Sequence, residues 1–170
     1  MTNELLEQRR TLLKKRFRTS MLQLYVVFAI TAYNCVAELV IPSFVLPVSF
    51  YLPQFISSYA KFLSNSDGNR TLFVFLVILA FAILLFIGFC LIFARKIYKL
   101  MNAVTVTASI DMILLIYIGI SGLLVKGLQL FFLINLFAHV WILYLSVTAC
   151  RSSEGLEVLP EADAEAENSN

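Results

Sequence analysis

The stretch "LFVFLVILAFAILLFIGF", residues 72–89, decides the fold class of this chain. None of its 18 side chains is polar or charged, and the basic residues Arg95 and Lys96 follow shortly after it. A helix needs ~20 mostly apolar residues to cross the hydrocarbon core of a bilayer. The sequence therefore predicts a transmembrane helix over residues 72–94.

The composition of the whole chain points to the same class. Of the 170 residues, 60% are hydrophobic and 14% are charged. Soluble domains contain about 25% charged residues, and a chain this short lacks the interior volume to bury so many apolar side chains. The cysteines Cys35, Cys90 and Cys150 are widely spaced, so we expect neither a disulfide framework nor a zinc site. We expect an integral membrane protein.

Three further apolar stretches are long enough to cross a bilayer. They cover residues 21–41, which end before Pro42, residues 103–125 and residues 128–150. Only two residues separate the last two stretches, so we expect these to form a tight hairpin. The sequence thus predicts an all-α integral membrane protein with four transmembrane helices in an antiparallel bundle.

The distribution of Lys and Arg predicts the orientation of the bundle. Basic residues are concentrated before the first stretch, between the second and third, and after the fourth. The opposite side carries only Lys61, Arg70 and Lys126. Because cytoplasmic loops are enriched in Lys and Arg, we expect both the N- and C-termini to be cytoplasmic.

The two ends of the chain differ in charge. We predict that residues 1–20 are a basic amphipathic cytoplasmic segment, a helix that lies on an anionic leaflet. The alternative is a basic helical flank that continues into the first transmembrane helix. Residues 21–150 are the four-helix transmembrane domain. Residues 151–170 contain six acidic residues and no apolar periodicity, so we expect an acidic disordered cytoplasmic tail.

The long outer loop, residues 42–71, mixes prolines with aromatic and apolar side chains. We expect it to lie in the membrane interface, with a short amphipathic helix over residues 54–63. The alternative is a re-entrant segment, which is tolerated only where protein or water satisfies its backbone. On the helix over residues 54–63, one face would carry Phe55, Ile56, Tyr59 and Phe62.

Three ionisable residues lie inside the predicted spans: Glu38, Asp111 and His139. Asn34 precedes Glu38 by one helical turn, and Asn135 precedes His139 by one turn. From the cytoplasmic end, Asp111 lies about 12 Å deep and His139 about 16 Å deep. Since their helices are joined by a very short turn, we expect a contact between this carboxylate and this imidazole.

Such a contact has three interpretations: a polar clamp between helices, a proton or substrate pathway, or a site for another protein. One Asp and one His are too few ligands for a metal site, and no catalytic motif or cofactor motif occurs. The candidate functional residues are therefore Asp111, His139, Asn135, Asn34 and Glu38, without a catalytic, cofactor-binding or metal-binding assignment.

These features favour a small non-enzymatic multi-pass membrane protein that binds another membrane component, as an accessory or assembly subunit, a regulator or an immunity-type protein. An oligomeric small transporter or channel subunit with a protonatable Asp/His pair is the alternative, and a lipid-directed membrane enzyme comes third. The expected partners are the lipid bilayer and another membrane protein or a second copy, not nucleic acid. Compact loops favour a bacterial inner (plasma) membrane over a eukaryotic endomembrane.

Overall fold

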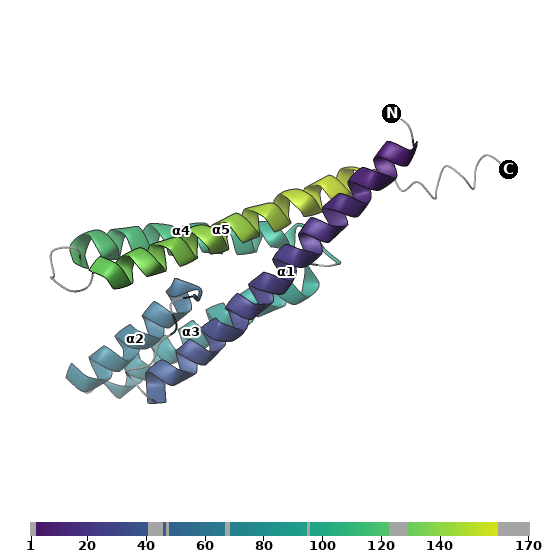
Figure 1. The fold of residues 1–170 in the computed structure, drawn as a ribbon. Helices are drawn as coiled ribbons and strands as arrows, with labels where there is room; N and C mark the ends of the chain where they lie inside the picture. The colour runs from purple at the N-terminus through teal and green to yellow at the C-terminus, as the bar shows by residue number, and fades with distance from the viewer. Residues whose placement is uncertain are drawn as a thin grey trace.

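The computed structural model describes residues 3–40, 46, 48–66, 69–94, 96–122 and 129–159. Within these ranges the backbone forms five helices and no strand. The helices are α1 (Asn3–Val40), α2 (Tyr51–Ser66), α3 (Arg70–Phe93), α4 (Leu100–Gly122) and α5 (Gln129–Val158) (Figure 1).

Four of these helices, α1, α3, α4 and α5, are long and apolar enough to cross a membrane. Each of them overlaps one of the four predicted stretches, which confirms the prediction of an all-helical chain with four such helices. Helix α3 begins after Asn69, whose side-chain Oδ1 accepts a hydrogen bond from Leu72 N at 3.1 Å. This N-cap satisfies one of the amide groups that a helix start leaves without a partner.

Helix α1 joins the basic N-terminal residues and the first apolar stretch without a break. Its 38 residues correspond to a length of about 57 Å, well beyond the ~30 Å of a bilayer core. Within the described residues, a separate surface helix is therefore not formed at positions 3–20. The continuous basic flank, which was the alternative expectation, describes this end of the chain.

Helix α5 extends eight residues beyond the predicted end of the fourth stretch and reaches Val158. The expectation of disorder from residue 151 onward is therefore wrong for residues 151–158, while residues 160–170 lie outside the described residues. The physical reason is packing: Ser152 and Ser153 are buried, and Leu156 packs against the main apolar cluster. Acidic composition alone did not reveal these contacts.

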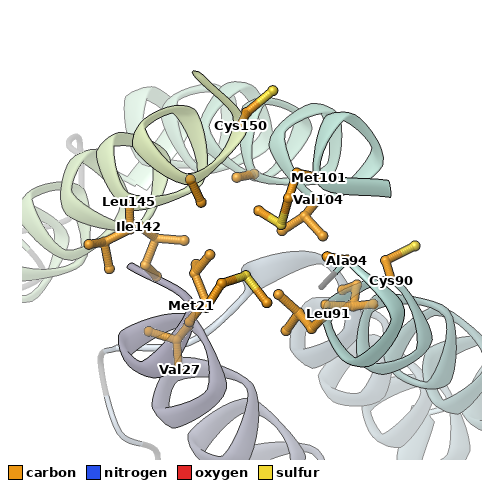
Figure 2. Packing of buried hydrophobic residues seen from close by; sticks show 14 of the residues in the cluster. Met21, Val27, Cys90, Leu91, Ala94, Met101, Val104, Ile142, Leu145 and Cys150 are labelled. Carbon is orange, nitrogen blue, oxygen red and sulfur yellow. The ribbon is translucent and has the colours of Figure 1, made fainter. Parts of the chain in front are cut away.

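The main apolar cluster lies between α1, α3, α4 and α5 (Figure 2). Met21 from α1, Leu91 from α3, Met101 from α4 and Ile142 from α5 are all fully buried there. Their side chains point toward one another in Figure 2. The cluster lies where the end of α3 and the start of α4 meet the middle of α1 and the second half of α5.

Gly119 of α4 faces the ring of Phe132 in α5 so closely that an added Cβ atom would overlap the ring. We expect Gly119→Ala to lower the thermal unfolding temperature in detergent, followed by circular dichroism. Overpacking costs about 1–3 kcal/mol, which outweighs the ~1 kcal/mol that alanine adds to a helix interior.

Gly155→Ala is the matched control, because its Cβ would meet only the flexible end of Leu13, at 3.0 Å from Cδ1. This control should be neutral or stabilising. The double variant Gly119→Ala/Phe132→Leu should recover part of the lost stability. If Gly119→Ala were as stable as Gly155→Ala, the close approach of α4 and α5 at this point would be disproved.

Candidate functional site

Between α1 and α2 the chain runs back along α1. Leu46 N donates to Asn34 Oδ1 at 3.0 Å, and Asn34 Nδ2 donates to the Leu46 carbonyl at 2.8 Å. Four residues later, Phe50 N donates to Thr31 Oγ1 at 2.8 Å. Thr31 lies nine residues before the end of α1 at Val40, so α2 begins about 14 Å back along α1.

The Asp111 carboxylate holds the start of α2. Oδ2 accepts a hydrogen bond from Tyr51 N and Oδ1 accepts one from Leu52 N, each at 3.0 Å. The next residue, Pro53, has no N–H group to satisfy. Asp111 is only 1% exposed, and a negative charge at a helix N-terminus interacts favourably with the helix dipole. Asp111 therefore acts as a cap supplied by one helix, α4, to another.

The side chain of Gln54 in α2 connects the same region to α1. Its Oε1 accepts hydrogen bonds from Ser49 Oγ at 2.7 Å and from Asn34 Nδ2 at 3.2 Å. Asn34 is fully buried. Because its side-chain amide bonds to both Leu46 and Gln54, it connects α1, the returning chain and α2. The sequence pattern singles out Asn34 as a candidate but neither its partner Gln54 nor Ser49, which bonds to Gln54.

Glu38 contributes to this region through its backbone carbonyl. Lys61 of α2 extends its Nζ to the last turn of α1, where it donates to the carbonyls of Glu38 at 2.8 Å and Leu39 at 3.2 Å. A cation at this position satisfies carbonyls that a helix end leaves open and complements the negative end of the dipole. Thus α2 is fixed to α4 at its start and to α1 further along.

His139 lies beside this region but does not bond to Asp111. Its Nδ1 lies 2.8 Å from the Asn135 carbonyl, and its Nε2 is buried without a hydrogen-bond partner among the described residues. The ring packs edge-on against Tyr51, with ring centroids 5.9 Å apart.

The predicted carboxylate–imidazole contact is therefore wrong. Both oxygens of Asp111 accept hydrogen bonds from the start of α2, and His139 bonds within its own helix. Tyr51 contacts both residues, since its amide bonds to Asp111 and its ring packs against His139. The start of α2 thus occupies the place where the direct contact was expected.

One face of α2 carries a ladder of aromatic rings, formed by Tyr51, Phe55, Tyr59 and Phe62. Successive ring centroids are 5.8, 6.2 and 6.5 Å apart, with interplanar angles of 26° or less. The first two rings are half-buried, whereas Tyr59 is 47% and Phe62 is 64% exposed. The amphipathic helix expected over residues 54–63 is confirmed as part of α2. We call these four residues the aromatic ladder.

The opposite face of α2 is made of small residues. Pro53, Ser57 and Ala60 are buried, and α2 packs mainly against α3 and α1. Small side chains allow close approach between helices. Helix α2 therefore has one face packed against the protein and one aromatic face that becomes more exposed along its length.

The hydrogen bonds described above serve to hold α2 in position. No group of three or more His, Cys, Asp or Glu side chains with metal-binding geometry occurs in the described parts of the chain. The five sequence-predicted residues separate into two sets. Asn34, Glu38 and Asp111 all hold α2 in place, while Asn135 and His139 bond to each other within α5.

Comparison of the chain with known protein families, characterised proteins and solved structures finds no match.

The role of Asp111 as a cap makes a prediction about stability. Asp111→Asn keeps one acceptor oxygen but directs an NH₂ group at a backbone N–H, so at least one charge-assisted hydrogen bond is lost. We expect the free energy of unfolding to fall by about 2–3 kcal/mol. Hydrogen exchange should accelerate at the amides of Tyr51 and Leu52 before it does elsewhere.

His139→Leu is the contrasting variant. It removes Nε2, which has no partner among the described residues, together with the bond from Nδ1 to the carbonyl within the same helix, and it changes the side-chain volume little. We therefore expect a loss below about 1.5 kcal/mol. Exchange at the start of α2 should then remain slow. Destabilisation by His139→Leu equal to that by Asp111→Asn, with equally fast exchange at Tyr51 and Leu52, would contradict the assignment of the cap to Asp111 alone.

Proposed function

We propose that this chain is a small non-enzymatic membrane protein that binds another membrane protein through the aromatic ladder of α2. The observation that carries this proposal is the fixed position of α2, whose start is capped by buried Asp111 while Tyr59 and Phe62 stay exposed. Aromatic side chains are enriched at the cores of protein interfaces and often dominate binding energy. A rigid row of them loses little entropy when a partner binds.

The surroundings of α2 support this proposal. We infer that α2 and the described residues just before it form a re-entrant segment, since the chain returns along α1 before α2 begins. Irregular backbone within a bilayer is tolerated only where protein or water satisfies its polar groups. Here Asn34, Thr31 and Asp111 do so. These three buried side chains hold the returning chain and the start of α2 in place.

The proposed arrangement is an antiparallel bundle with both termini in the cytoplasm. Leu13 near the start of α1 contacts Gly155 near the end of α5, which supports placing the two ends on one side. The basic residues of α1 favour the cytoplasmic side. The bacterial inner membrane remains our preferred location, on the basis of the short connections between helices.

A transporter or channel subunit is the second candidate, and one observation favours it. The buried Nε2 of His139 has no hydrogen-bond partner in the described chain, as expected of a group that exchanges a proton. In transporters, however, the start of a broken helix points at the substrate, whereas α2 points at Asp111 of the same chain. Proton flux in proteoliposomes that is abolished by His139→Gln would favour this candidate.

Site-specific photo-crosslinking tests the binding proposal. A photoreactive amino acid is introduced at Tyr59 or Phe62 of the full chain in its native membrane, and the adducts are identified by mass spectrometry. The matched control positions are Phe75 and Phe86 of α3, which are comparably exposed aromatic residues. We expect one defined membrane protein to be crosslinked from the α2 positions and not from the α3 positions.

The same experiment also tests the role of Asp111 as the cap of α2. Asp111→Asn should reduce crosslinking from Tyr59 several-fold, because α2 is no longer held at its start. Adducts with lipid alone, or with a second copy alone, would overturn the proposal of a separate partner protein. Equal crosslinking from α2 and α3 would show that the aromatic ladder has no special role.

A further inference from the structure

A pocket of about 370 Å³ lies between α1 and α5, near the end where α1 begins. On α1 it is lined by residues at positions 12, 15, 16, 19, 20 and 23, a spacing that places them along one face of a helix. On α5 it is lined by Tyr144, Leu145 and Thr148. This pocket is separate from the region that holds α2.

Two basic side chains line the pocket without an ion-pair or hydrogen-bond partner among the described residues. Lys15 and Arg16 are exposed, and neither forms an ion pair or hydrogen bond within the part of the chain that the structure describes. Next to them the pocket offers the hydroxyls of Thr19 and Ser20, of which Ser20 is buried. Cations together with hydroxyl donors form a suitable site for a phosphate group.

The position and the remaining lining indicate which phosphate compound fits. The pocket lies where α1 changes from its basic residues to the apolar stretch that begins at Met21, and lipid headgroups are expected at such a boundary. Leu12 and Leu145 add apolar surface to the polar groups. Basic pockets between transmembrane helices on the cytoplasmic side bind anionic lipid headgroups.

We propose that this pocket binds one anionic phospholipid. Lys15 and Arg16 contact the phosphate of the headgroup, Thr19 and Ser20 donate hydrogen bonds to its oxygens, and an acyl chain lies against Tyr144 and Leu145. The bound lipid bridges α1 and α5. The site does not depend on the aromatic ladder or on its partner.

The test measures thermal stabilisation of the full chain in detergent by added phosphatidylglycerol. We expect phosphatidylglycerol to raise the melting temperature in a saturable manner and phosphatidylcholine to have no such effect. Each basic side chain contributes about fivefold to binding of an anionic lipid, so Lys15→Gln/Arg16→Gln should raise the half-saturating concentration by roughly 30-fold.

Lys14→Gln/Arg18→Gln is the matched control, since it removes one Lys and one Arg from the opposite side of α1. It should change the half-saturating concentration less than twofold. Thr148→Phe fills the pocket without changing any charge and should also weaken the effect, which keeps the test valid if the charge variants fold poorly.

Three results would overturn the proposal. Equal losses in the two charge variants would indicate diffuse attraction to α1 rather than a site. Equal stabilisation by phosphatidylcholine would exclude recognition of the negative charge. Equal stabilisation by inorganic phosphate would assign the pocket to free phosphate instead of a lipid.

Discussion

The amide groups at the start of α2 must find hydrogen-bond acceptors away from water, and this requirement organises the centre of the molecule. A buried backbone N–H without an acceptor costs about 1–3 kcal/mol, and more in hydrocarbon. Asp111 supplies two acceptors at once, and Thr31 supplies a third for Phe50. The positions of the returning chain, of α2 and of its exposed rings all depend on these bonds.

The sequence was sufficient to predict the four long helices and insufficient to predict their connections. An apolar stretch of about 20 residues is a local signal, and α3 begins and ends within two residues of its predicted bounds. The path into α2 depends on Asp111, which lies 60 residues from Tyr51 in the chain. The helical end of α5 likewise packs against residues far away in the chain, since Leu156 packs against the main apolar cluster and Leu13 of α1 lies close to Gly155.

The difference between local signals and contacts between distant residues also explains why the candidate residues were found but their partners were not. Counting residues along a helix predicts the depth of Asp111 and His139, and both side chains are buried in the structure. Their hydrogen-bond partners depend on the segment that lies between them, which is the start of α2. Counting residues along α4 and α5 cannot predict that α2 lies there. Pro53 offered the one local signal, because proline is favoured in the first turn of a helix. That signal locates the start of α2 but not its cap.

The cap also has a consequence for biosynthesis. Asp111 belongs to α4, which leaves the ribosome well after residues 46–66, and α3 is made in between. Until α4 is in place, the amides of Tyr51 and Leu52 have no carboxylate to bond. Helix α2 therefore acquires its cap only after α4 has been made, so its final position depends on a segment that follows it in the sequence.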